Sequence, residues 1–532
     1  MSRARWLVFA TAALAGAPVA AQQQLPGWAG AWSPLRPITT QLRHLPLGAA
    51  VDDWGFGLSP RSGLLWTAGN PAGLASDVTE SRAWLGLSRS DQGGEYRRPL
   101  DPNGVGTWTL GGLGWRPLGR GAVAGRIAFD SRHASVATGT DVLAPYDADP
   151  FVMVDTSSPG RNSTHATLEG AAGWRFGGWH MGFSLGAELH RDRSQNTRFS
   201  RIGRSSVTGA MVGIGRRISP LDLTLALHGR WLGRRETHLL STTPGGSTVF
   251  ILFGYDEPDT IAVSPPGGLL RRTTADGFAA GAALQGRVGS VDWIAFVERG
   301  AWDAGHVFAV AVDNPATDRW KATATAMGLS GGVPLFDRVL LRLDARYDRL
   351  NGDARRADLQ GVVFRIADSR LRLGGSLELL DPASPWQLAL SLRGDQVKLD
   401  REDFLAGAPL HLTAWMSEAA LAVGRHFGNG SAGVVVAAGL FTPAAAIPDP
   451  ATLGPVYGTY LAPEQSLNAV AALPLSAGLW MRYRFSAGVA AYLQALGGRT
   501  AARGVLPPIP FLPTGDRHQT RITAGIELTS IT

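Results

Sequence analysis

Apolar and polar residues alternate one by one along many segments of the chain. Between 221 and 231, leucine and tryptophan occupy most odd positions, and polar residues such as Asp222 and Arg230 occupy even positions. A repeat of two residues is typical of a β-strand with two different faces. The same alternation recurs at 339–348, 370–379, 386–395 and 481–489. The pattern therefore predicts an all-β fold.

The length of these segments favours a membrane barrel over a soluble sandwich. They run for about 10 to 16 residues, whereas soluble strands usually have about 5 or 6 and a tilted transmembrane strand needs roughly 9 to 11. Aromatic residues often lie near segment ends, where an interfacial girdle would form: Trp115, Trp174, Trp179, Trp231, Trp293, Trp386 and Tyr347. Two long uncharged stretches contain Pro443 and Pro474, so they divide better into strands than into helices. The predicted fold is a transmembrane antiparallel β-barrel in the outer membrane.

The number of strands is predicted as about 16 to 18, with 18 preferred because single-chain bacterial barrels have an even number. The predicted strands are 80–90, 104–116, 121–133, 163–175, 178–192, 203–217, 221–237, 269–288, 290–303, 317–333, 336–350, 356–380, 385–398, 409–427, 431–442, 465–473, 478–496 and 517–531. In this reading 356–380 is one tall strand that follows a turn at Asn351-Gly352. Short turns, as at Gly119, alternate with long loops such as 134–162 and 238–268. Because such barrels have short periplasmic turns and long outer loops, both termini are expected in the periplasm.

The N-terminal region is expected to precede the barrel as two segments. Arg3 and Arg5, the apolar run 6–15 and the small residues Val19-Ala20-Ala21 predict a signal peptide over 1–21. Residues 22–79 lack the alternation, which predicts a plug or hatch in the lumen or a periplasmic segment. The barrel itself is assigned to 80–532.

One short motif lies within that segment, in the run Asn70-Pro71-Ala72-Gly73-Leu74. Proline at 71 favours an extended conformation for Asn70, whose side chain can then fix a turn. The motif resembles the Asn-Pro-Ala-Gly-Leu signature near the N-terminus of FadL-like and PorV-like outer-membrane barrels. That resemblance implies transport of hydrophobic compounds, or a role in type IX secretion. It covers about ten residues, and the chain departs from the common pattern by lacking a terminal aromatic residue.

Charge and composition limit the kinds of ligand and catalytic site that the chain can have. The net charge is +7 and the pI about 10.1, yet no dense basic run supports nucleic-acid binding. The absence of cysteine excludes thiol nucleophiles and cysteine-based zinc sites. Arginine on a lipid face near the midplane costs about 2–4 kcal/mol, so charged strand residues are expected to face the lumen. The candidate lumen residues are Arg342, Asp344, Arg346, Asp348, Arg372, Glu378, Arg393, Asp395, Arg482 and Arg484. They would form either a structural network or a charged constriction that selects solutes.

The leading functional hypothesis is a channel or transporter for small or hydrophobic solutes. The alternative is a non-enzymatic scaffold or accessory subunit for secretion or surface attachment. No catalytic residue, cofactor or metal is predicted, since the acidic clusters at 146–150 and 255–259 lack the spacing of a calcium loop. Expected partners are outer-membrane lipid and lipopolysaccharide, the barrel-assembly machinery during biogenesis and, under the alternative, a secreted or surface protein.

Overall fold

A computed structural model describes residues 70–74 and 81–530, apart from gaps between strands at 96–101, 136–138, 141–150, 156–159, 196–198, 219–221, 243–246, 253–258, 264–267, 310–316, 336–337, 380–383, 406, 447–469 and 504–514. The predicted signal peptide 1–21, and all of the segment 22–79 except 70–74, lie outside the described residues.

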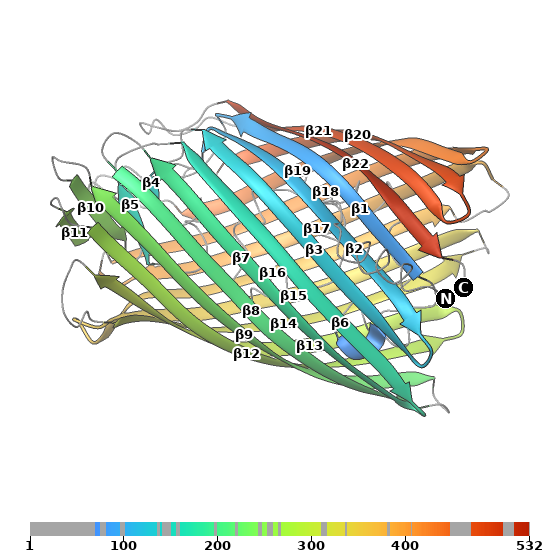
Figure 1. Cartoon of the computed structure of the whole chain (residues 1–532), viewed down its shortest axis with the longest axis horizontal. Helices are drawn as coiled ribbons and strands as arrows, with labels where there is room; N and C mark the ends of the chain where they lie inside the picture. Colours follow the sequence, from blue (N-terminus) through green and yellow to red (C-terminus); the bar gives the residue numbers. More distant parts are fainter. Residues whose placement is uncertain are drawn as a thin grey trace, which may run out of the picture.

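Eighteen antiparallel strands form one sheet that closes on itself (Figure 1). Each strand of this sheet pairs with the next along the chain, and β1 pairs with β22 to close the barrel. The barrel strands are β1 (Ser81–Gly94), β2 (Gly104–Leu118), β3 (Gly121–Ser135), β6 (Arg161–Phe176), β7 (Trp179–Gln195), β8 (Phe199–Ile218), β9 (Leu223–Thr242), β12 (Gly268–Val288), β13 (Val291–Ala309), β14 (Thr317–Leu335), β15 (Val339–Arg356), β16 (Gly361–Leu379), β17 (Trp386–Asp403), β18 (Ala408–Phe427), β19 (Gly430–Ala446), β20 (Ala471–Ser486), β21 (Val489–Arg503) and β22 (Asp516–Ser530). The predicted fold class and the preferred number of 18 strands are confirmed.

Short turns gather at one end of the barrel and longer connections at the other. The first residue of the turns at Gly119, Gly177, Gly289 and Gly428 has φ between +53° and +61°. Glycine adopts this conformation without a steric penalty, which explains why each hairpin turns there. The start of β1 pairs with the end of β22 at this same end (Ser81 with Ser530). By the usual rule for such barrels, this short-turn end faces the periplasm.

The outer face of the wall is apolar. On β7, for example, Trp179, Met181, Phe183, Leu185 and Leu189 point outward, and their exposed fractions range from 42% to 58%. A continuous apolar surface of this size is incompatible with water, whereas it matches the lipid-facing band of an outer-membrane barrel. The chain is therefore an outer-membrane β-barrel. No helix of the described residues is long and apolar enough to cross a membrane.

The predicted hairpin at Asn351-Gly352 is wrong. Both residues lie inside β15, and the turn is at 357–360, before β16. The strand predicted over 356–380 is a single strand, as expected, but it begins later, at Gly361. Gly352 is needed for packing, because a Cβ there would lie 2.2 Å from the ring of Trp320 on the neighbouring strand. The glycine thus marks a close side-chain approach within the wall.

The predicted strands 465–473 and 478–496 are also misplaced. The structure has β20 and β21 instead, with the turn at 487–488. The sequence predicts a break at Pro474, but this residue lies within β20. Its ladder to β19 lapses there, between the pairs Ala438–Leu475 and Phe441–Ala472. Proline has no N–H to donate, so a local gap in the ladder accommodates it. The predicted total of 18 strands is still correct, because the prediction and the structure both have two strands in this region.

Trp115 does not belong to an outer girdle. On β2 the outward residues are Trp108 and Leu110, so the odd-numbered Trp115 faces the lumen. It is 8% exposed, and its ring centroid lies 4.6 Å from that of Trp84 on β1. In contrast, Trp174, Trp179, Trp231 and Trp386 are 38% to 50% exposed on the outer face.

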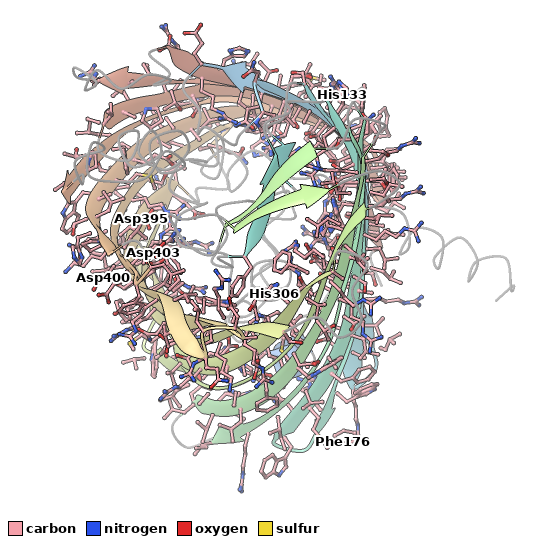
Figure 2. All side chains as sticks on the ribbon, turned by 90° about the vertical axis from the view of Figure 1, so that its left-hand side faces the viewer. His133, Phe176, His306, Asp395, Asp400 and Asp403 are labelled. Carbon is pink, nitrogen blue, oxygen red and sulfur yellow. The ribbon has the colours of Figure 1, made fainter. Side chains whose placement is uncertain are left out.

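A second, smaller sheet lies at the loop end of the barrel. It consists of β4 (Gly139–Thr140), β5 (Val152–Asp155), β10 (Ser247–Leu252) and β11 (Asp259–Val263). These strands come from the two segments predicted as the long loops 134–162 and 238–268. β10 of one loop pairs with β5 of the other. Seen end-on, this loop sheet crosses the opening of the barrel (Figure 2).

Candidate transport pathway in the barrel lumen

Three glycines form a flat seat on the lumen side of the wall near the short-turn end. Gly173 of β6 pairs with Gly182 of β7, which pairs with Gly213 of β8. A Cβ on Gly182 would lie 2.2 Å from the carbonyl oxygen of Pro71, and one on Gly213 would lie 2.1 Å from Oδ1 of Asn70. The glycine seat therefore leaves the space that the Asn70–Leu74 segment occupies.

Asn70 ties this segment to itself and to the wall. Its Oδ1 accepts a hydrogen bond from the backbone N–H of Ala72 at 3.0 Å, and its Nδ2 donates to the carbonyl oxygen of Leu227 on β9 at 3.1 Å. Pro71–Gly73 form a single turn of 3₁₀-helix, in which Gly73 donates its N–H to the carbonyl oxygen of Asn70. Asn70 and Ala72 are fully buried. The structure thus places Asn70, Pro71, Ala72 and Gly73, which the sequence predicts to form a turn, inside the barrel and against the glycine seat.

The ten predicted lumen residues all face inward. Asp395 of β17 is fully buried among three guanidinium groups, with N–O distances of 3.0 Å to Arg370, 3.2 Å to Arg372 and 3.3 Å to Arg393. Asp395 and Asp403 lie on the inner side of this wall and Asp400 on its outer side (Figure 2). The sequence predicts Arg372, Arg393 and Asp395 as lumen residues, but it does not identify Arg370 as their partner.

The other candidates form simple ion pairs of two residues, or face the lumen without a described ion-pair partner. Arg342 lies 2.9 Å from Glu378 and Arg346 lies 2.9 Å from Asp348. Arg482 pairs with Glu527 of β22 at 2.8 Å, a partner that the sequence reading did not identify. Asp344 fills the space beside Gly374, where a Cβ would lie 2.2 Å from its Oδ1. Arg484 lies at the short-turn end of β20.

Further buried charge pairs line the opposite wall. Glu236 of β9 accepts from Arg271 and from His238 at 2.5 Å each, and it also contacts Arg234. Arg161 and Asp192 pair at 2.6 Å on β6 and β7. Several of the buried carboxylates thus pair with one or more basic side chains, as in a network that stiffens the wall.

The loop-side half of the lumen has an apolar wall. Its buried members on β9 to β16 are Leu240, Leu269, Trp302, Trp320, Phe364 and Ile366. Phe151, next to β5, is fully buried in the same cluster. Its carbonyl oxygen accepts a hydrogen bond from Nη1 of Arg271 at 2.9 Å, and its ring centroid lies 4.8 Å from that of His306. The loop sheet is thus connected to the inner wall through Phe151.

No group of three histidine, aspartate or glutamate side chains among the described residues could hold a metal ion. The side chains of the acidic clusters at 146–150 and 255–259 lie outside the description. His165 and His190 face the lumen with ring centroids 6.2 Å apart, among Asp130, Glu188 and Asp192. That the protein is not an enzyme stays a prediction.

No protein-family model and no curated protein matches the chain in sequence. Among solved structures, the ferric yersiniabactin uptake receptor FyuA from Yersinia pestis is 11% identical, with 85% of this chain and 80% of that chain covered and a TM-score of 0.41. The ferric citrate transporter FecA in the unliganded form is 8% identical, with 84% and 78% covered and a TM-score of 0.43. The copper transporter OprC is 10% identical, with 84% and 80% covered and a TM-score of 0.40.

The resemblance of the Asn70–Leu74 motif to FadL-like barrels does not extend to the strand number, since those barrels usually have 14 strands. Membership of that family is therefore not established by the fold. From its own geometry, the chain is an 18-stranded outer-membrane β-barrel with a loop sheet at one end of the lumen and a docked segment near the other.

Proposed function

We propose that the protein is a gated outer-membrane conduit for small solutes that carry an apolar part. The observation that carries this proposal is the apolar wall in the loop-side half of the lumen. A channel for hydrated ions needs polar groups along its length. The leucine, isoleucine and tryptophan side chains of this wall are buried in the structure, so an apolar solute would contact them after the loop sheet moves aside.

Two features are suited to gate such a conduit. An 18-stranded barrel is wide enough for an aqueous channel unless something fills it. The loop sheet crosses the opening at the outer end, and the Asn70–Leu74 segment occupies the wall near the periplasmic end. Neither belongs to the 18-stranded sheet, so each can move aside without breaking the ladders of the barrel. The charged network between them stiffens the wall during that movement.

The apolar wall can be tested by making it polar. We expect the double variant Leu269→Asn, Ile366→Asn to reduce the uptake of a medium-chain fatty acid into proteoliposomes at least fivefold, while KCl conductance stays within twofold. Leu496→Asn, which alters an inward apolar residue of a different cluster, serves as the control and should leave fatty-acid uptake unchanged.

Equal loss of uptake in the variant and in the control would contradict a specific role for this wall. If the intact protein takes up neither the fatty acid nor KCl, yet purifies with a stoichiometric protein partner, the scaffold hypothesis replaces the conduit.

A further inference from the structure

Four arginines lie close together on the outer face of the barrel, on β7, β8, β9 and β12. We call Arg191, Arg204, Arg235 and Arg272 the outer arginine cluster; all four are exposed. Arg191 lies directly opposite Arg204. Thr237 pairs with Arg204 on one side and with Arg272 on the other, and Arg235 is two residues before Thr237 on the same face. Neighbouring strands are about 4.8 Å apart, so the cluster spans roughly 14 Å.

These arginines lie at the loop-side edge of the apolar band, where polar and apolar outward residues mix, as with Leu239 beyond Arg235 on β9. Along β7 the last large outward apolar residue before Arg191 is Leu189, which is 58% exposed. On β9 the outward Trp231 precedes Arg235, and on β12 Phe278 lies on the membrane side of Arg272. Outward tryptophan marks the membrane interface. The guanidinium groups therefore reach the level of the outer-leaflet headgroups.

Their charge is not compensated within the described part of the protein. None of the four forms an ion pair with a described acidic side chain, and Asp276, the outward acid nearest along β12, also has none. By contrast, the outward Arg319 and Lys321 on β14 share Asp303 at 3.8 Å and 3.6 Å. Like charges directly opposite each other destabilise a sheet. An uncompensated pair such as Arg191 and Arg204 therefore favours an anionic ligand.

The cluster also borders a hollow in the outer surface. This hollow has a volume of about 400 Å³ and is lined by Arg191, Arg204, Arg235 and Thr237, with Phe129 and Leu189 as its large apolar members. Guanidinium groups bind phosphate through paired N–H donors. The apolar members can contact a hydrocarbon chain. The site thus combines phosphate recognition with contact to an acyl chain, at the height of the membrane surface.

We propose that the outer arginine cluster binds the phosphate groups of a phosphorylated glycolipid of the outer leaflet, such as lipopolysaccharide. The site is on the outer wall, and its occupation does not depend on whether the lumen conducts solutes. A bound glycolipid would neutralise the cluster and fix the loop-side ends of β7, β8, β9 and β12 at the membrane surface.

The test measures binding of purified lipopolysaccharide to the detergent-solubilised full chain. The variant is Arg191→Gln, Arg204→Gln, Arg235→Gln. The control, Arg116→Gln, Arg216→Gln, Arg425→Gln, removes the same charge from outward arginines at the short-turn end, where Arg216 and Arg425 lie over Trp179 and Trp386. Each arginine at an anionic surface contributes about fivefold in affinity, so we expect the variant to bind roughly a hundredfold more weakly. The control should stay within threefold, and dephosphorylated lipopolysaccharide should bind the intact protein at least tenfold more weakly.

Heat-modifiable migration of both triple variants establishes that they fold. Equal weakening in the variant and the control, or weakening in neither, would overturn the proposal. So would full competition by inorganic phosphate at an equal phosphate concentration, because the site would then recognise the ion alone. Loss of a co-purifying acidic protein from the variant, with lipopolysaccharide binding intact, would also overturn it and assign the cluster to a protein partner.

Discussion

Adding a single methyl group to the glycine seat should release the docked segment. In Gly213→Ala the new Cβ would lie 2.1 Å from Oδ1 of Asn70, whereas ordinary contact begins at 3.4 Å. Asn70 must therefore retreat by about 1.3 Å, the difference between these two distances. A shift of that size breaks the 3.1 Å hydrogen bond from Asn70 to the carbonyl oxygen of Leu227.

The loss of this hydrogen bond lowers the stability of the docked segment by an amount that can be calculated. A buried polar group that loses its partner costs about 1–3 kcal/mol. Taking roughly 2 kcal/mol, the ratio of docked to undocked segment falls about thirtyfold. The barrel strands keep their ladders, because the alanine is accommodated by displacing a segment that is not part of the sheet. Single-channel recording in planar bilayers should therefore show a large rise in the open fraction, with unchanged heat-modifiable migration.

Gly170→Ala is the matched control. It makes the same change on β6, three residues from Gly173, at a position where a Cβ would meet nothing within 4 Å. We expect it to conduct like the intact protein. If Gly213→Ala folds and also conducts like the intact protein, the Asn70–Leu74 segment does not close the pore and the argument from the glycine seat fails.

Three further predictions concern the loop sheet, the charged wall and the topology. Phe151→Ala removes a fully buried side chain, at a cost of about 3–5 kcal/mol to the attachment of the loop sheet, and should make channel openings more frequent; Phe176→Ala, at a 56% exposed position, should not. Asp395→Asn removes the carboxylate among three guanidinium groups and should destabilise the barrel by about 3 kcal/mol in urea unfolding, whereas Asp400→Asn, at an exposed outward position, should change it by less than about 1 kcal/mol. An equal effect of the two substitutions would contradict the buried network. An epitope tag inserted within 141–150 should be accessible on intact cells, and one at Gly119 should not; the reverse labelling would refute the assigned orientation.

Most of the fold can be predicted from local sequence, because the alternation within each strand shows which of its residues face inward and which face outward. The alternation at 339–348 predicts that Arg342 and Asp344 face the lumen without knowledge of any neighbour. Where a local signal had two meanings, the prediction failed. The Asn351-Gly352 pair is usual in a hairpin, yet Gly352 is there to admit the ring of Trp320. Pro474 usually ends a strand, yet a gap in one ladder accommodates it.

The contents of the lumen depend on contacts between residues far apart in the chain. Arg271 joins Glu236 and Phe151, which are 35 and 120 residues away, and only the register of the strands brings them together. The loop sheet likewise pairs two loops that show no strand pattern strong enough to predict it. The three glycines of the seat, at 173, 182 and 213, are visible in the sequence. Only the register of the strands shows that they lie side by side.

The uptake of an apolar solute by the intact protein tests the central claim most directly. Proteoliposomes that contain the full chain would be compared with protein-free liposomes for the initial rate of entry of a medium-chain fatty acid and of a neutral sugar of similar mass. The conduit predicts that the protein accelerates entry of the fatty acid at least tenfold more than entry of the sugar. Equal acceleration of both solutes, or of neither, would contradict it.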